Sequence, residues 1–388
     1  MKKVTSILLV LTMLLVLVAC GASDTATETN EASTDSAGAG EQATDEVIKI
    51  RVGWSPPDIT GVFKTATDYM EKAIADAAEH GIEIELVTRS SATHTDAADQ
   101  IKTLENFIQN KVDVIVVSPT EVEAVKPALK KINEAEIPLI LVNMLDEMEG
   151  IHVDNFVGFD NAQAAAVSAY SMLDALGGPG VLGEGEKWDV PIETSMDLEW
   201  WEEQYKDVPT DSITGNIAII EGIAGDFFSS ERNRGFSEVI EKFPGVTIKT
   251  ILPANWNRQD AVEAAENIIQ NNPDLDGIFA SCAEMALGAY IAANNAGVAE
   301  DLIIISNDGT PESVQAIRDG QLDAETWHGF PEWGWYAMKF STMLALDQEV
   351  PQKFDIRPRT EYLENADNFY PEPKLEAIDW EAIKSAVK

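Results

Sequence analysis

Cysteine, histidine and basic side chains are scarce in this sequence. Its 388 residues include two cysteines and four histidines, and 27 Lys and Arg residues stand against 67 Asp and Glu residues, for a formal net charge of −40. Two cysteines cannot build a disulfide framework, and four histidines leave few ligands for a metal cluster. Nucleic acids and anionic lipid surfaces are recognised by clustered basic residues, so the charge argues against both as partners.

Apolar residues, by contrast, are plentiful. The chain is 45% hydrophobic and only 24% charged. This composition can bury a sizeable core, which excludes a globally disordered protein. The length predicts two domains.

One long apolar run stands at the N-terminus. Lys2 and Lys3 precede it, and it covers residues 7–19 with Thr12 as its one polar residue. It is short for a membrane span, which needs about 20 apolar residues, and it has the length of a signal-peptide core. The run ends in Leu-Val-Ala-Cys-Gly, which resembles the lipobox of bacterial lipoproteins. We therefore predict a lipoprotein signal peptide at 1–19 and lipidation of Cys20. The alternative is an ordinary signal peptide with a chance cysteine.

The next segment, residues 20–46, has no residues that could build a core. Positions 21–46 hold seven acidic residues, no basic residue, and no aromatic or branched aliphatic residue before Val47. Such a segment cannot bury enough apolar surface to fold, so we predict a disordered acidic tether.

From residue 48 the chain alternates short β-branched runs with amphipathic stretches of about a dozen residues. This alternation is typical of βαβ units and a parallel sheet with both faces covered. The predicted strands are 48–53, 83–87, 112–117, 138–142, 217–220, 246–252, 277–280 and 302–306. The predicted helices are 63–79, 96–109, 121–134, 229–242, 259–270, 284–296 and 311–318.

The pattern occurs twice. Residues 105–110 read ENFIQN and residues 266–271 read ENIIQN, and each is followed by an aspartate and an apolar strand. Two similar α/β lobes are the simplest interpretation. Ligands of open α/β sheets bind at the carboxyl ends of the strands, so a cleft between the lobes is the predicted site.

Residues 183–212 interrupt this rhythm with an acidic segment that carries three tryptophans. A long structured insertion is often functional. The alternative is a surface excursion held in place by its tryptophans.

Several motifs occur in an order that resembles a known family. They are Gly222-Ile-Ala-Gly225, Glu231-Arg232, Glu284-Met-Ala-Leu-Gly288 and Asn307-Asp-Gly-Thr-Pro311. Together they resemble the type I periplasmic binding proteins, ribose-binding subgroup, over about residues 47–350. The resemblance implies two doubly wound parallel-sheet lobes joined by a hinge. The first lobe would hold 47–159 and about 331–350, and the second 160–330 and about 351–388.

The resemblance also implies ligand-binding positions. Arg232 matches an arginine that holds sugar hydroxyls, which suits the fixed fork of donors on a guanidinium. Asp308 matches an aspartate that accepts from two hydroxyls. Asn143 stands where the family usually has aspartate. Trp256 stands where it has phenylalanine, and an aromatic face there would stack on a sugar ring. Asp58 or a neighbour would replace the asparagine of the first loop.

Other positions depart from the ribose pattern. Cys282 replaces a ligand asparagine, Met144 replaces an arginine, and Gly329 replaces a ligand glutamine with His328 beside it. We count Cys282 and His328 among the predicted ligand-binding residues. With Asn143, four polar contacts of a ribose site are altered, so we expect a ligand other than D-ribose. The larger aromatic ring of Trp256 suggests a ligand with a larger or more apolar ring surface.

Each of these residues also has a purely structural interpretation. Arg232 could form an ion pair on a helix surface, and Asp308 could cap the helix that begins at Pro311. Trp256 could belong to the core, Asn143 could be a turn residue, and Cys282 could be a small apolar filler.

The function implied is that of an ABC importer's substrate-binding lipoprotein. It would be a monomer without cofactor, held by its lipid on the extracytoplasmic face of a Gram-positive cell membrane, and it would close on a monosaccharide or related polyol and deliver it to the permease. The alternatives are a receptor for a non-sugar solute or signalling molecule and an extracellular glycoside hydrolase that uses a carboxylate pair. The sequence shows no motif for catalysis or for a metal, so no catalytic residues, metal ligands or enzyme activity are predicted.

Overall fold

The computed structural model describes residues 47–91 and 96–386. The predicted signal peptide, the lipidation site Cys20 and the whole predicted tether (20–46) lie outside the described residues. Among the helices of the described part, none combines the length and the apolar character that a membrane span requires.

The first lobe contains a six-stranded sheet in the order β11-β5-β4-β3-β1-β2, and all its strand pairs are parallel. β-Branched residues fill its central strands, as expected for a sheet buried on both faces. Its strands are β1 (Ile48–Ser55), β2 (Ile82–Thr88), β3 (Val114–Val117), β4 (Leu139–Val142), β5 (Asn155–Gly158) and β11 (Lys353–Asp355).

The second lobe repeats the arrangement with the order β12-β10-β9-β8-β6-β7. Its pairs are parallel except for β12, which runs antiparallel to β10 at the edge. Its strands are β6 (Gly215–Glu221), β7 (Val246–Pro253), β8 (Gly277–Ala280), β9 (Ile303–Asp308), β10 (Ala324–Trp327) and β12 (Arg359–Tyr362).

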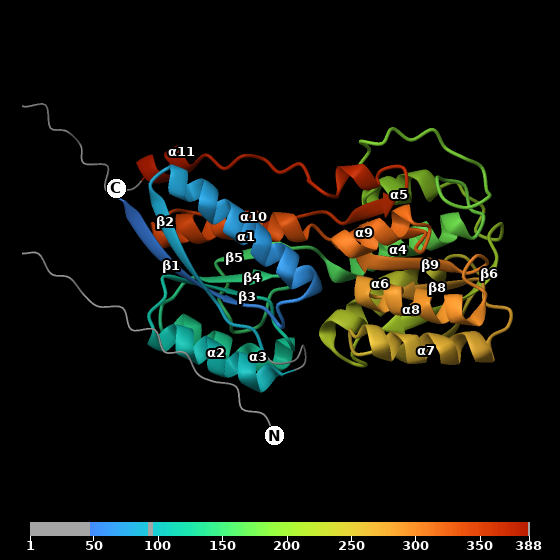
Figure 1. Ribbon diagram of the computed structural model, residues 1–388, viewed down its shortest axis with the longest axis horizontal. Helices are drawn as coiled ribbons and strands as arrows, with labels where there is room; N and C mark the ends of the chain where they lie inside the picture. Colours follow the sequence, from blue (N-terminus) through green and yellow to red (C-terminus); the bar gives the residue numbers. More distant parts are fainter. Residues whose placement is uncertain (1–46, 92–95, 387–388) are drawn as a thin grey trace, which may run out of the picture. The chain divides into compact units, whose positions relative to one another are not determined.

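Helices cover both faces of each sheet. In the first lobe α1 and α10 lie on one face, and α2 and α3 on the other (Figure 1). In the second lobe α4, α5 and α6 share one core cluster, and α7, α8 and α9 lie against the other face. The helices are α1 (Gly61–Glu79), α2 (Ala97–Gln109), α3 (Val122–Glu134), α4 (Asn161–Ala175), α5 (Leu198–Tyr205), α6 (Phe227–Ile240), α7 (Arg258–Asn271), α8 (Ala283–Ala296), α9 (Pro311–Arg318), α10 (Phe330–Ala345), α11 (Trp380–Ser385) and the short 3₁₀ helix η1 (Ala366–Asn368).

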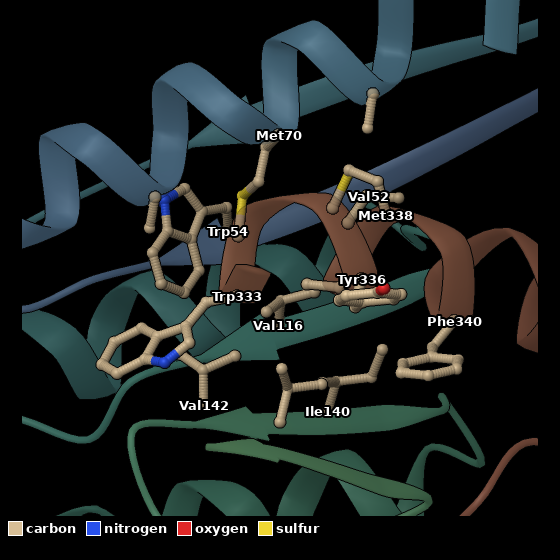
Figure 2. Packing of buried hydrophobic residues seen from close by; sticks show 14 of the residues in the cluster. Val52, Trp54, Met70, Val116, Ile140, Val142, Trp333, Tyr336, Met338 and Phe340 are labelled. Carbon is tan, nitrogen blue, oxygen red and sulfur yellow. The ribbon is translucent and has the colours of Figure 1, made fainter. Parts of the chain in front are cut away.

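The alternation of side chains along each strand assigns them to the two layers. Val114 and Val116 face the cluster under α1 and α10, whereas Ile115 and Val117 face the cluster under α2 and α3. Figure 2 shows α10 side chains packed between α1 and the sheet. The two helices approach closely at Gly334, where a Cβ would lie 2.1 Å from the carbonyl oxygen of Ala66. The predicted fold class, two parallel-sheet α/β lobes, is confirmed.

The predicted insertion is a packed part of the second lobe. It contains α5, and the Trp201 side chain is fully buried against α4. The indole nitrogen of Trp201 donates to the hydroxyl of Thr360 at 2.8 Å. The Asp174 carboxylate accepts from the backbone of Val181 and Leu182 and so holds the start of the loop. Burial raises the pKa of Asp174 to about 6.

One predicted lobe boundary is wrong. The sequence placed about 351–388 in the second lobe, but β11 pairs with β5 of the first sheet. Trp380 and Ile383 of α11 are buried in the first-lobe core. Within the described part of residues 351–388, β12, η1 and Phe369 lie with the second lobe. The apolar residues of 351–388 are divided between the cores of the two lobes. A local sequence pattern cannot indicate which distant core a residue joins.

Two buried carboxyl groups face each other at the edge of the second sheet. Glu325 and Glu361 are opposite in the β10–β12 pair, and both are fully buried. The Ser306 hydroxyl donates to Glu325, while both carboxyl oxygens of Glu361 have no hydrogen-bond partner among the described residues. Burial raises the pKa of Glu325 to about 8 and raises that of Glu361 well above its ordinary value.

We therefore predict that stability falls as pH rises between about 4.5 and about 8, because the folded protein retains protons that the unfolded chain releases above its ordinary pKa of 4.5. Glu325→Gln should remove part of this loss. The free energy of unfolding of the variant relative to the native chain should increase by up to about 1.4 kcal/mol per pH unit in this window. Urea unfolding at pH 5 and pH 8 measures it, with the exposed Glu364→Gln as control. An equal difference at both pH values would contradict the prediction.

Candidate functional site

A pocket lies where strand ends from both lobes converge. Its volume is about 730 Å³ including the part open to solvent, which is within the range of small-molecule sites. The segments that line it follow the carboxyl ends of β1, β4, β7, β8 and β9, as expected for parallel sheets. Of the seven predicted ligand-binding residues, the lining includes Asp58, Asn143, Arg232, Trp256, Cys282 and Asp308.

Arg232 lines the pocket and is buried, with 4% of its surface exposed. Its Nε donates to the amide oxygen of Asn161 at 3.0 Å, and an Nη donates to the backbone oxygen of Ser281. Asp308 lies 3.7 Å from the same Nη. Burial lowers the pKa of Arg232 and Asp308 opposes that shift, but a guanidinium stays charged in proteins. The alternative of a surface ion pair is therefore wrong.

Asp308 ends β9 and is oriented by a helix rather than by solvent. One of its carboxylate oxygens accepts from the backbone nitrogen of Ala283 at 3.0 Å, in the first turn of α8. The positive end of the helix dipole stabilises the carboxylate there. The helix that begins at Pro311 is capped instead by Thr310, whose hydroxyl accepts from the backbone nitrogen of Ser313. The structure thus excludes the alternative role of Asp308 as the cap of that helix.

Trp256 forms an aromatic wall supported by a glycine. A Cβ at Gly222 would lie 2.1 Å from the indole ring, so the ring lies directly on the Gly222 backbone. The guanidinium carbon of Arg232 lies 5.3 Å from the ring centroid, within cation–π range. The ring therefore has one side against the protein and is held beside the buried charge.

Asn143 follows β4, and its side-chain oxygen is buried without a hydrogen-bond partner among the described residues. Its backbone oxygen accepts from the side chain of Asn161 at 3.0 Å. A buried polar atom without a partner costs stability unless something else satisfies it. Asn143 thus offers a hydrogen-bonding group at the pocket from the first lobe.

Cys282 also lines the pocket, with 7% of its surface exposed. Burial raises the pKa of its thiol well above the ordinary value. It is a free thiol and remains protonated at neutral pH, so it offers a weakly polar surface rather than a nucleophile.

His328, the seventh predicted residue, is not part of the pocket lining. It is fully buried, with its ring centroid 4.1 Å from that of Phe159. Its Nδ1 lies 3.5 Å from an oxygen of Asp308. Burial, followed by the nearby Arg232, lowers the pKa of His328 well below its usual range, so the ring is neutral.

Several lining residues were not among the seven predicted ligand-binding residues. Glu284, in the first turn of α8, accepts two hydrogen bonds from Arg258, which also donates two to Glu312. This bridge fixes the rim of the pocket. Glu284 was visible within a family-like motif. The apolar lining residues Phe63, Phe228 and Phe330 gave no signal, because an aromatic residue early in a helix is equally typical of the core.

Three lining residues have strained backbones. The φ angles are +73° at Asn143, +57° at Trp256 and +125° at Asp308. Residues other than glycine avoid this region, and such strain persists only where surrounding contacts impose it. Its concentration at the strand ends indicates that the pocket geometry is imposed by the fold.

Comparison with known proteins identifies the family. The model described as "Periplasmic binding protein domain" matches residues 52–349. This chain belongs to that family. The predicted resemblance is therefore confirmed, and the family is one of binding proteins.

Individual members of the family share about a quarter of their aligned residues with this chain. The ribose import binding protein RbsB of Bacillus subtilis (strain 168) is 25% identical over 249 residues, which is 64% of this chain and 67% of the relative. A xylitol-binding protein of Mycolicibacterium smegmatis is 26% identical over 286 residues, 74% of this chain and 69% of the relative.

Solved periplasmic binding proteins share the fold. An ABC transporter solute binding protein from Actinobacillus succinogenes 130z, with bound D-allose, has a TM-score of 0.67 at 23% identity and covers 82% of this chain and 100% of its own. Another from Bacillus halodurans C-125, with bound myo-inositol, has a TM-score of 0.66 at 23% identity, covering 84% of this chain and 99% of its own.

The support of Trp256 gives a test of the pocket in this periplasmic binding protein. Gly222→Ala should displace the indole ring and destabilise the protein by about 1–3 kcal/mol, the usual cost of overpacking. Urea unfolding and the indole N–H resonance of Trp256 in an NMR spectrum measure the two effects.

Gly225→Ala is the matched control. It adds the same methyl group in the same loop, where no atom lies within 4 Å, and it tests only the strain of its positive φ. An unchanged Trp256 resonance in Gly222→Ala would contradict the conclusion that the backbone of Gly222 positions the indole ring.

Proposed function

We propose that this protein is the solute receptor of an ABC importer and that it binds a monosaccharide or related polyol between its two lobes. The observation that carries the proposal is the arrangement of Arg232, Asp308 and Trp256 in one pocket. A fixed guanidinium and a carboxylate can bind neighbouring hydroxyls, and an indole face can cover the C–H face of a ring.

The comparisons support this choice of solute. The curated relatives are named for ribose import and for xylitol, and the two solved structures hold D-allose and myo-inositol. All four are small neutral polyhydroxylated molecules. Carboxylates outnumber arginines in the lining, since Asp58, Glu284 and Asp308 stand beside Arg232. This balance disfavours sugar phosphates and sugar acids.

We also propose that D-ribose itself is not the preferred ligand. The amide of Asn143 and the thiol of Cys282 stand where the ribose-binding subgroup is expected to have stronger hydrogen-bonding side chains. The aromatic wall at Trp256 is larger than a phenylalanine. Both changes favour a ring with more apolar surface and fewer polar contacts.

Calorimetry with a panel of neutral monosaccharides and polyols tests the proposal, and at least one should bind at micromolar concentrations. Asp308→Asn should weaken that binding roughly 10- to 150-fold, because one charge-assisted hydrogen bond contributes about 1.5–3 kcal/mol. Asp301→Asn, on the exposed turn before β9, is the control and should leave affinity unchanged. A panel without a single binder would refute a sugar or polyol as the ligand.

A sensory role is the second candidate. A fructose-binding periplasmic domain of a hybrid two-component system shares this fold, with a TM-score of 0.65 at 19% identity. Deleting the gene separates the two roles. Loss of uptake of the radiolabelled ligand supports import through a permease, whereas intact uptake with a lost transcriptional response supports sensing.

We further propose that the receptor works as a monomer anchored through Cys20 at the outer face of the cell membrane. The Leu-Val-Ala-Cys-Gly sequence after a short apolar run supports the lipid anchor. Cells grown with radiolabelled palmitate should incorporate label into the protein, and Cys20→Ser should abolish incorporation. Labelling of the Cys20→Ser variant at the native level would contradict the anchor.

A further inference from the structure

Within the part of the chain that the structure describes, the backbone passes between the two lobes four times. The first three passages are the residues 159–160 between β5 and α4, 328–329 between β10 and α10, and 356–358 between β11 and β12. After β12 the chain returns to the first lobe through residues 363–379, which we call the strap. It leads from the second sheet to α11 and can be followed in red in Figure 1.

The strap is anchored in the second lobe by an aromatic residue and an arginine. Phe369 is 5% exposed, and its ring centroid lies 5.0 Å from that of Trp327. An Nη of Arg318 donates to Asp367 at 2.8 Å and to the backbone oxygen of Tyr370 at 2.6 Å. A side chain and the backbone of the strap are therefore both held.

A second anchor lies in the first lobe. Trp380 is 1% exposed, and its indole nitrogen donates to Asp76 of α1 at 2.7 Å. Ile378 and Ile383 are buried in the same core. Burying side chains of this size contributes about 1.5–3 kcal/mol each, so this end does not detach easily.

Between the anchors the strap has little contact with the protein. Residues 371–377 form no helix or strand and are mostly exposed. The backbone of Glu376 contacts the first lobe, where its oxygen accepts from the indole nitrogen of Trp335 of α10. Pro371 and Pro373 restrict the backbone of this short span, so it cannot lengthen as freely as a glycine-rich linker.

The strap covers a crevice beside the ligand pocket. The crevice is lined by Tyr69 of α1, Pro311 of α9, and Phe369 and Pro371 of the strap. The same two helices bound the ligand pocket, because α1 begins there at Gly61 and α9 follows its lining residues directly. A motion that separates α1 from α9 therefore opens the pocket and the crevice together.

We propose that the strap limits the separation of the lobes and so sets the balance between the open and closed forms of the receptor. Hinged closure of two lobes is a general mode of ligand capture. A short connection anchored in both lobes raises the free energy of widely open states. This leaves the binding-competent state more populated, so less of the ligand's binding free energy is spent on closure. The inference concerns the motion of the lobes and holds whatever solute is bound.

Lengthening the strap tests whether it limits the separation of the lobes. Deleting it would remove core residues such as Trp380, so we instead insert about eight glycine and serine residues after Glu372, which keeps both anchors. The control carries the same insertion after Glu300, in an exposed turn within the second lobe. Thermal melting establishes that both full-length variants are folded.

Small-angle X-ray scattering of the ligand-free chains is the first readout. The strap insertion should give a larger radius of gyration than the control insertion. Equal radii of gyration would overturn the proposal that the strap limits lobe separation. This readout does not depend on the identity of the ligand.

The second readout is affinity for D-allose, D-ribose and myo-inositol, whichever of these binds the native chain. The strap insertion should weaken binding at least about fivefold, the lower end of typical conformational coupling. Unchanged affinity for a sugar that binds the native chain would refute the proposed effect on the open–closed balance. If none of the three binds, the scattering result alone decides.

Discussion

The second lobe is organised around one buried positive charge, the guanidinium of Arg232. Removing such an ion from water costs several kcal/mol unless partners replace its hydration. Those partners are Asn161 of α4, the backbone of Ser281 after β8, and Asp308 at the end of β9. Satisfying one charge therefore aligns three strand and helix ends. The pocket is the side of that arrangement left open to a ligand.

The same constraint accounts for the positions around the charge. Asp308 faces Arg232 from a backbone conformation that residues other than glycine avoid, and the first turn of α8 holds its second oxygen. The indole of Trp256 lies beside the guanidinium because Gly222 leaves room for it. His328, beside Asp308, stays neutral in the same low-dielectric surroundings. Strain, burial and charge pairing at this site are consequences of a single requirement.

Much of the fold could be predicted from the sequence, and the omissions have physical reasons. Strands rich in Val and Ile and helices with one apolar stripe were found. The helix α4 was missed because it is buried on nearly all sides and shows no amphipathic period. The strand β10 was missed because Ala-Glu-Thr-Trp carries an ionisable residue, Glu325, that is buried beside Glu361. The tail was misassigned because its halves belong to different cores.

The sequence by itself determined the duplicated parallel-sheet pattern, because strand periodicity is a local property of the chain. Six pocket residues followed from motifs that resemble a known family. Only the tertiary structure decided which roles those residues can have. It left His328 out of the pocket lining, added Glu284 and the phenylalanines to that lining, and led the C-terminal strap back to the first lobe. These outcomes depend on which distant groups share a buried volume, and that is settled only when the lobes are packed.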